Sequence, residues 1–381
     1  MKCVIRVFVI LWIVMVVSFS MALADQPMNQ TGFALLESFY DGKYNCAVSP
    51  VSLALALSMV SQGAAGDTQA QIDHLTGLTD AKTAKSLQDE LCTRGFKIAN
   101  AIFVADDLEM KEDWLTVIKD SYDGEAFPFG TAEALDAWVK EKTNGLLEKA
   151  PAAPDESTRM ALLNAVAMDM QWQFPFLPEA THEDVFHAPD GDITVPFMCQ
   201  SFDWYAVYGE QDGAQLLQLD YKPVNGKSMS MFLALPEEGE MDALLQSLSK
   251  EGLGFFDCIE AVEREVILWL PKVDIKVHNE LKEPLQALGM DLPFTNAADL
   301  GGIAEEPLKI GDILQDIRIQ IDEEGTLAAA VTEIDLAAGE AYDPEPPILM
   351  RLDRPFVALI VDGETGTVCF AAVVMNPLGD E

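Results

Sequence analysis

The segment at residues 323–332 constrains this chain more than any other, because small residues dominate it. Its sequence is Glu-Glu-Gly-Thr-Leu-Ala-Ala-Ala-Val-Thr. A strand fixed in a core normally carries larger packing groups, whereas small side chains can pass between two existing strands without steric conflict. The composition therefore indicates a strand that is able to move.

The same segment continues with a period of two residues, as in a strand with one buried face. The residues on that face are Thr326, Ala328, Ala330, Thr332, Ile334 and Leu336, whereas Glu333 and Asp335 lie on the other. Residues 337–347 contain a glycine and three prolines and lack an apolar period, which predicts an exposed loop. A strand held in reserve within a loop suggests a conformational switch. An alanine-rich edge strand or short helix followed by a linker fits the segment alone equally well.

The first 24 residues have the three parts of a secretory signal peptide. Lys2 and Arg6 give a positive start, residues 7–17 are apolar, and Ala22-Leu23-Ala24 precedes Asp25. We predict cleavage after Ala24 and a single domain at residues 25–381, secreted to the extracellular space and without membrane attachment. An uncleaved membrane anchor is the alternative.

The net charge is −39, and removal of the signal peptide would make it more negative by two. Such a surface repels phosphates and anionic lipids, which argues against nucleic acid and membrane partners. We expect a soluble monomer. Five cysteines follow the signal peptide, and those at positions 46 and 369 have apolar neighbours, so we predict buried free thiols and no disulfide framework.

Enzyme motifs are missing from the sequence. It has no Gly-x-Ser-x-Gly elbow, phosphate-binding glycine loop or Cys-x-x-Cys pair. His182 and His187 are five residues apart rather than four, which on a helix places them off a common face and excludes a zinc-protease motif. We therefore predict no catalytic residues, no metal and no cofactor.

Helical and strand patterns are mixed along the chain, which indicates an α+β architecture with large sheets. Helical spacing occurs at 52–59, 69–78, 113–122 and 132–147. Strand-like or apolar runs occur at 96–104, 161–170, 213–221, 228–235, 265–270, 316–321, 356–361 and 368–374.

A dozen motifs, in order along nearly the whole mature chain, resemble those of the serpin family. They include Asn45 with Ser49-Pro50-Val51-Ser52-Leu53-Ala54, Asn100-Ala101-Ile102-Phe103, Thr143-Asn144-Gly145, Asn164-Ala165-Val166 with Trp172 and Phe176, Leu270-Pro271-Lys272-Val273, and Asp353-Arg354-Pro355-Phe356. The resemblance implies a single α+β domain with three β-sheets, eight to nine helices and an exposed reactive-centre loop.

The resemblance also implies a mechanism that suits the mobile segment. A target serine protease cleaves the loop and is held as a covalent acyl-enzyme, while the loop inserts into the main sheet as a new strand. About ten ladder hydrogen bonds at ~1 kcal/mol each, with burial of two aliphatic side chains at ~1.5–3 kcal/mol apiece, give a driving force on the order of 10 kcal/mol. The native state would then be kinetically trapped. A non-inhibitory serpin with a binding or chaperone-like role is the alternative.

The resemblance assigns the hinge of the loop to Glu323, Glu324, Gly325, Thr326, Ala328, Ala329, Ala330 and Thr332. Thr326 is small and uncharged where insertion starts, as an inhibitor requires. Leu327 and Val331 are bulkier than usual, but both fall on the outward face. Glu323 has no evident lysine partner near Phe294, so the sequence does not show how stable the closed sheet is.

The resemblance assigns two further sites, one under the main sheet and one at its top. The shutter, a polar cluster that must open to admit the strand, comprises Ser49, Ser52, Asn164 and Gln315. Gln315 replaces a histidine common in relatives, and since glutamine both donates and accepts hydrogen bonds, we predict a working shutter that is insensitive to pH. Trp172 matches the breach, where insertion begins, although simple core packing would bury it equally.

The family spacing from Gly325 places the scissile bond at Gly339-Glu340, with a shift of one to three residues left open. Residues 333–350 contain no lysine or arginine, which argues against a trypsin-like target. The small and aliphatic residues before the bond suit elastase-like or subtilisin-like proteases. A later bond, at Glu340 or Tyr342, would instead imply a glutamyl or chymotrypsin-like target.

Overall fold

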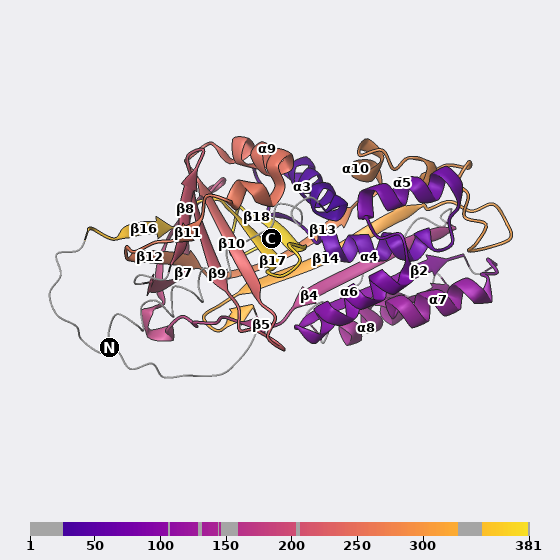
Figure 1. Ribbon diagram of the computed structural model, residues 1–381, viewed down its shortest axis with the longest axis horizontal. Helices are drawn as coiled ribbons and strands as arrows, with labels where there is room; N and C mark the ends of the chain where they lie inside the picture. The colour runs from indigo at the N-terminus through magenta and orange to yellow at the C-terminus, as the bar shows by residue number, and fades with distance from the viewer. Residues whose placement is uncertain are drawn as a thin grey trace.

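The computed structural model describes residues 26–105, 107–128, 132–143, 145, 159–202, 206–326 and 345–379. The predicted signal peptide and most of the predicted loop, at residues 327–344, lie outside the described residues. Within them the chain forms three main sheets and eight α-helices. The helices between residues 50 and 142 gather at one end of the molecule, and the four-stranded sheet lies at the other (Figure 1).

One of the main sheets has five strands. Their order is β13 (Val273–Glu280), β14 (Asp312–Ile321), β4 (Met160–Met168), β2 (Phe96–Val104) and β3 (Glu125–Pro128). β14 and β4 are parallel neighbours, whereas β2 pairs with β4 in the antiparallel direction. Both of the central strands β4 and β2 are buried almost throughout, which explains their continuous apolar sequences.

Alternate residues of β2 pack into two different cores. Ile98 and Ile102 join the main core, which also contains helix α4 (Pro50–Ser61). Ala99 and Phe103 face the other way and pack with Trp138 of α8 (Ala132–Lys142). A helix therefore covers each face of the sheet, and all twelve residues of α4 are buried, as expected for a helix that is apolar all round.

The seven-stranded sheet closes the core beside α3 (Pro27–Phe39) and α9 (Met241–Glu251). Its order is β1 (Cys46–Val48), β18 (Val368–Val374), β17 (Phe356–Asp362), β10 (Met229–Pro236), β9 (Ala214–Asp220), β8 (Val207–Gln211) and β11 (Glu260–Ala261). All of these neighbours are antiparallel. The sheet thereby joins the two ends of the described chain.

The remaining elements are shorter or lie at the edges. The four-stranded sheet has the order β16 (Ile348–Arg351), β12 (Val266–Pro271), β7 (Gly191–Phe202) and β6 (His182–Ala188), and β15 (Gly325–Thr326) pairs with β5 (Met170–Gln171). The other helices are α5 (Gly66–Thr76), α6 (Ala81–Thr93), α7 (Glu112–Tyr122) and α10 (Lys282–Ala287), with short 3-10 turns η1 (Pro178–Ala180), η2 (Gly252–Phe256) and η3 (Leu292–Phe294). None of the described helices is long and apolar enough to cross a membrane.

The predicted elements are largely confirmed, with one difference. The apolar run at 161–170 is two strands rather than one, since Asp169 leaves the ladder and donates its backbone N–H to the carbonyl of Gly95. His182 and His187 lie on strand β6, a strand that was not predicted from the sequence. The five cysteines of the described residues are all free thiols, and Cys46 and Cys369 are buried as predicted.

Candidate functional site at the open end of the five-stranded sheet

The parallel strands β4 and β14 pair along only part of their length. Their ladder runs from Ala161 opposite Asp312 to Val166 opposite Ile317, and then stops although both strands continue. At this end the short strand β15 pairs with β5 in the antiparallel direction, with Thr326 opposite Met170. The first residues of the predicted hinge therefore already belong to a sheet beside the ends of β4 and β14.

A tight turn leads from β14 into β15. The backbone N–H of Asp322 donates to the carbonyl of Gly325 at 2.9 Å, and the Asp322 carboxylate accepts from the N–H groups of Glu324 and Gly325 at 2.9 and 3.2 Å. Gly325 has a φ of +155°, and a Cβ atom there would lie 2.0 Å from the carbonyl oxygen of Met170. Only glycine allows the two backbones to approach this closely.

Thr326 is anchored in the protein interior. Its side chain is 2% exposed, and its hydroxyl lies 3.0 Å from the hydroxyl of Tyr221, which is fully buried. Burial raises the pKa of Tyr221 well above its ordinary value, so the phenol stays protonated. The two hydroxyls satisfy each other where no water reaches them.

Trp172 holds both this pair and the turn before it. Its ring stacks on Tyr221 with centroids 4.6 Å apart. Its indole N–H donates to the carbonyl of Asp322 at 2.9 Å, and its backbone N–H donates to the carbonyl of Glu324 at 2.9 Å. Trp172 therefore packs in the core and binds the start of the hinge at the same time.

Glu323 forms an ion pair with Lys272 at 2.6 Å, so its lysine partner comes from a segment other than the one near Phe294, where the sequence offered none. Lys272 lies between β12 and β13, and the register of Val273 opposite Ile321 brings it to the turn that follows β14. Thr181 also donates to the Glu323 carboxylate at 2.8 Å. Burial alone would raise the pKa of Glu323, but the hydrogen bonds from Lys272 and Thr181 hold the pKa below its ordinary value.

We call Trp172, Tyr221, Lys272, Glu323 and Thr326 the hinge anchor. Sequence reasoning missed two of its members as partners of the hinge, Tyr221 and Lys272. Both come from segments distant from residues 323–326, and only the strand register brings them together.

A second cluster lies lower in the sheet, where β4 and β14 are still paired. Its members Ser49, Ser52, Asn164 and Gln315 are all fully buried. The Gln315 amide nitrogen donates to Asn164 Oδ1 at 2.7 Å and to the Ser49 carbonyl at 3.1 Å, while its oxygen accepts from the Ser49 N–H at 3.2 Å. Gln315 and Asn164 are direct partners across the β14–β4 ladder. The structure therefore brings together the four residues predicted for the shutter.

Asn164 links this cluster to α4 and to the next strand. Its amide nitrogen donates to Ser52 Oγ at 2.6 Å and to Asn100 Oδ1 at 2.8 Å. Asn100 lies on β2, and sequence reasoning did not include it, although an asparagine within an apolar strand was a visible signal. Ser49 Oγ donates to the carbonyl of Cys369, which connects the cluster to the seven-stranded sheet.

Part of the predicted site lies outside the described residues. These positions are Ala328, Ala329, Ala330, Thr332, Gly339 and Glu340. The described site is therefore the start of the hinge, its anchor and the polar cluster beneath it.

The three sheets, with the predicted hinge beside the open end of the β4–β14 pair, define one class of protein. Comparison with known proteins identifies that class. The family model described as Serpin (serine protease inhibitor) matches residues 26–377. The chain is 33% identical over 354 residues to mouse alpha-1-antitrypsin 1-1, covering 87% of this chain and 83% of the relative. It is 30% identical over 370 residues to an uncharacterized serpin-like protein of Thermococcus kodakarensis, covering 92% and 85%.

Solved structures agree with the sequence relatives. Human thyroxine-binding globulin, solved as a complex with thyroxine, matches with a TM-score of 0.81 at 26% identity, covering 93% of this chain and 99% of that one. The native state of tengpin, a thermophilic serpin, matches with a TM-score of 0.79 at 27% identity, covering 92% and 93%. The chain belongs to the serpin family, and the predicted α+β serpin fold is confirmed.

Proposed function

We propose that this protein is an inhibitory serpin, a suicide substrate that a serine protease cleaves in the loop following the hinge. The observation that carries the proposal is the position of Gly325 and Thr326. They are already paired with β5 at the end of the sheet where the β4–β14 ladder stops. The hinge thus starts in the place from which a strand would insert.

Insertion between β4 and β14 would improve the hydrogen bonding of the sheet. The strands there are now parallel to each other. β15 runs antiparallel to β5, so a strand that continues from it would run antiparallel to both neighbours. One parallel pairing would give way to two antiparallel ones, which are slightly more stable per residue. The alanines and threonine that follow Thr326 on its face of the strand offer no bulk to obstruct this step.

The shutter assignment of the polar cluster follows from the same geometry. Separating β4 from β14 must break the bond between Gln315 and Asn164, because these two residues face each other across the ladder. Each bond in the cluster has neutral partners, so its strength does not depend on a titrating group. We therefore assign it the role of a latch that is independent of pH.

We propose Gly339-Glu340 as the scissile bond and an elastase-like or subtilisin-like protease as the target, on the sequence grounds given above. The protease serine oxygen would attack the Gly339 carbonyl carbon and form an ester. The C–N bond to Glu340 would then break, and the released amine of Glu340 would take up the proton lost by the serine hydroxyl. The ester would be trapped if insertion is faster than its hydrolysis. We further propose that the protein is secreted after cleavage before Asp25.

The proposal is tested with a panel of elastase-like, subtilisin-like, chymotrypsin-like and trypsin-like proteases. We expect a complex with an elastase-like or subtilisin-like enzyme that survives denaturing electrophoresis. Mass spectrometry should show that the released peptide begins at Glu340 or within three residues of it. Cleavage in the loop without such a complex would favour a non-inhibitory binding role. Expression of the full chain in a secreting host, with N-terminal sequencing, tests the processing site.

A heat-denaturation assay separates insertion from trapping. The loop is cut with a protease that is not trapped, and the melting temperatures of the intact and cut protein are compared. Insertion predicts a large rise in melting temperature after cutting. An unchanged melting temperature would contradict the insertion mechanism itself.

A further inference from the structure

A buried ion pair that belongs to neither the hinge anchor nor the polar cluster lies just before strand β2. Arg94, at the end of α6, pairs with Asp362, at the end of β17, at 2.9 Å, and each side chain is 1% exposed. Arg94 also pairs with Glu90 of α6, and Glu90 pairs in turn with Lys227, in the connection between β9 and β10. We call these four residues the ionic tie.

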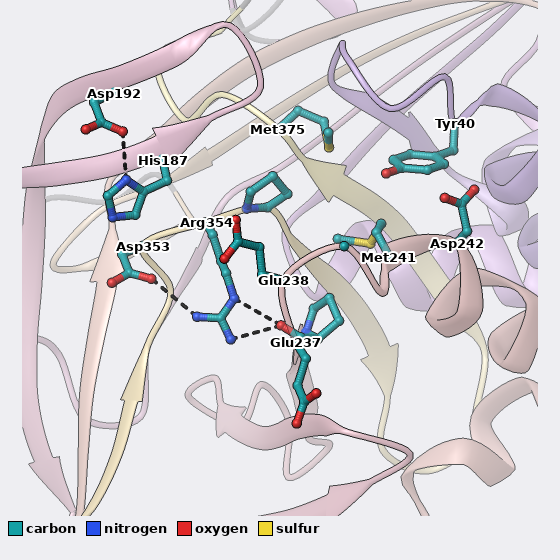
Figure 2. Close-up of a pocket in the computed structure, with 13 residues that line it drawn as sticks. Tyr40, His187, Asp192, Glu237, Glu238, Met241, Asp242, Asp353, Arg354 and Met375 are labelled. Carbon is teal, nitrogen blue, oxygen red and sulfur yellow. Dashed lines mark hydrogen bonds and ion pairs between the residues drawn. The ribbon is translucent and has the colours of Figure 1, made fainter.

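The ionic tie joins two different sheets. β2 of the five-stranded sheet begins two residues after Arg94, whereas Asp362 is the register partner of Met229 in the seven-stranded sheet. Arg94 also donates to the sulfur of Met229 at 3.3 Å. At the other end of β10, Arg354 donates to the carbonyl of Pro236 at 3.1 and 2.9 Å (Figure 2). β10 is therefore held at both ends, and Arg94 fixes the start of β2 to it.

The ionic tie also borders the place where the β4–β14 ladder stops, which we call the mouth of the sheet. Gly95 follows Arg94, and its carbonyl accepts the backbone N–H of Asp169 at 3.1 Å. A Cβ atom on Gly95 would lie 2.2 Å from the carbonyl oxygen of Asp169 and 3.2 Å from Met170 Cγ. Met170 is the residue that pairs with Thr326 of the hinge. The tie therefore holds the β2–β4 side of the mouth close to the strand that receives the hinge.

Opening the mouth must move one side of the five-stranded sheet relative to the seven-stranded sheet. Neighbouring strands lie about 4.8 Å apart, so a strand placed between β4 and β14 doubles their separation. The β14 side is held through β13, whose Asn279 donates to the carbonyl of Ala47 in β1 at 2.8 Å. The β2 side is held by Arg94 and by Phe96, which stacks on Phe370 of β18. Stacked rings can slide over each other, whereas an ion pair that is pulled apart in the interior leaves two charges without water.

The chemistry of the tie suits positioning better than it suits stability. A buried ion pair seldom stabilises a fold more than apolar residues of similar volume would. The Nε–H of Arg94 has no acceptor among the described residues, so the burial of its guanidinium group is not fully compensated. What the pair supplies is a fixed distance and direction, because a guanidinium group is planar and its donors are rigidly arranged.

We propose that Arg94 is a positioning residue that resists opening of the mouth and so sets how often β4 and β14 separate. It acts through Asp362 and Glu90 on the start of β2, and not by contact with the reacting bond. A protein without the tie should open its mouth more often. For the inhibitor proposed above, on which this consequence rests, entry of the loop would then compete better with hydrolysis of the ester by water.

Two matched double variants test the tie. Arg94→Met with Asp362→Asn removes both buried charges, so neither is left unpaired, and keeps an oxygen at position 362 for the backbone N–H of Glu364. The control, Arg159→Met with Asp107→Asn, makes the same two changes at an exposed ion pair just before the opposite end of β4. Any difference between the two variants therefore reports the position of the ion pair and not the change in charge.

Hydrogen–deuterium exchange of the uncut protein measures opening without any protease. The informative amides are those that pair β4 with β14, within residues 161–166 and 312–317. We expect them to exchange at least tenfold faster in the tie variant and at an unchanged rate in the control variant. Amides of β7 and β12 in the four-stranded sheet should be unchanged in both. Unchanged exchange between β4 and β14, or an equal rise in the four-stranded sheet, would overturn the proposal, because the latter indicates general unfolding.

A second measurement uses a protease for which the unmodified protein yields more cut chains than complex. We expect the tie variant to be cut at the same rate but to yield at least twofold fewer cut chains for each trapped protease, with the control variant unchanged. An unchanged or larger ratio despite faster exchange would overturn the claim that the tie opposes entry of the loop. If no protein in the series traps any protease, the proposed function fails, and the exchange measurement alone decides whether Arg94 holds the mouth.

Discussion

The hydroxyl groups of Tyr221 and Thr326 lie 3.0 Å apart in a fully buried position, although 105 residues separate them in the sequence. This contact joins the seven-stranded sheet region to the first inward residue of the hinge. Because Trp172 stacks on the same tyrosine ring, the start of the hinge is fixed on two sides. The structure therefore holds the hinge firmly at its origin.

Removing both hydroxyls of this pair should cost less than the sum of the two single removals. Tyr221→Phe leaves the Thr326 hydroxyl buried without its partner, and Thr326→Val does the same to Tyr221, at about 1–3 kcal/mol each in the free energy of unfolding. In the double variant no polar group is left unpaired, so its loss should be smaller than the sum. Urea denaturation of the four proteins measures the coupling, with the exposed Tyr44→Phe as control. Strict additivity would contradict the buried hydrogen bond.

Thr326→Arg should convert the proposed inhibitor into a substrate. The site is 2% exposed, and a guanidinium there would be desolvated without a carboxylate partner designed for it. The variant should be cut in the loop by the same protease at a similar rate but form no complex resistant to denaturation. Thr116→Arg, on the exposed face of α7, is the control and should behave as the unmodified protein. Protease trapping by Thr326→Arg would rule out insertion from this position.

The sequence was sufficient to predict the elements with strong periodicity and the positions of the polar cluster. Apolar runs such as β17 and β18 are buried on both faces, so their composition alone indicates strands. The strand β6 was missed because it lies at a sheet edge with most of its side chains exposed, and its composition resembles a polar loop. Burial of the side chains, more than their β-propensity, decided which strands could be predicted from the sequence.

The partners of the hinge were harder to predict for a different reason. Lys272 reaches Glu323 because β13 and β14 pair with Val273 opposite Ile321. A register of this kind depends on the packing of the whole sheet, and a shift of one residue would point the side chain to the opposite face. Lys272 stands in a recognisable sequence motif, but the sequence alone does not show how close it lies to the turn that carries Glu323.

Gln315→Leu should weaken the native state, because it leaves Asn164 Oδ1 and the backbone N–H of Ser49 without partners in a buried site, although the Ser49 carbonyl still accepts from the N–H of Leu53. At about 1–3 kcal/mol for each of the two unsatisfied groups, we expect a loss of at least about 2 kcal/mol in urea denaturation. Gln246→Leu, on the exposed face of α9, should change stability little. A similar small loss in both variants would contradict the importance of the cluster.

Gln315→His should introduce a dependence on pH that the unmodified protein lacks. Histidine titrates near pH 6.5, and its charged form could no longer accept the hydrogen bond that Gln315 Oε1 takes from Ser49. The midpoint of denaturation of the variant should therefore fall relative to the unmodified protein between pH 7.5 and 5.5. Parallel curves for the two proteins across this range would show that residue 315 does not govern the latch.

Glu323→Gln should reduce stability at neutral pH and make little difference in acid. The Lys272 and Thr181 hydrogen bonds hold the pKa of Glu323 below its ordinary value, so its carboxylate stabilises the folded state above the unfolded pKa of about 4.3. That contribution is lost as the pH falls through the folded pKa. Because Lys272 is 36% exposed and partly screened, we expect a difference of about 1 kcal/mol at pH 7. Urea denaturation from pH 7 to 3 should show the difference between the two proteins narrowing below about pH 4.5. In a protein that carries Lys272→Met, Glu323→Gln should have most of its effect on stability removed. The control Glu109→Gln should show no change with pH in its stability difference. If the stability difference caused by Glu323→Gln stays constant with pH, the ion pair is not the source of that difference.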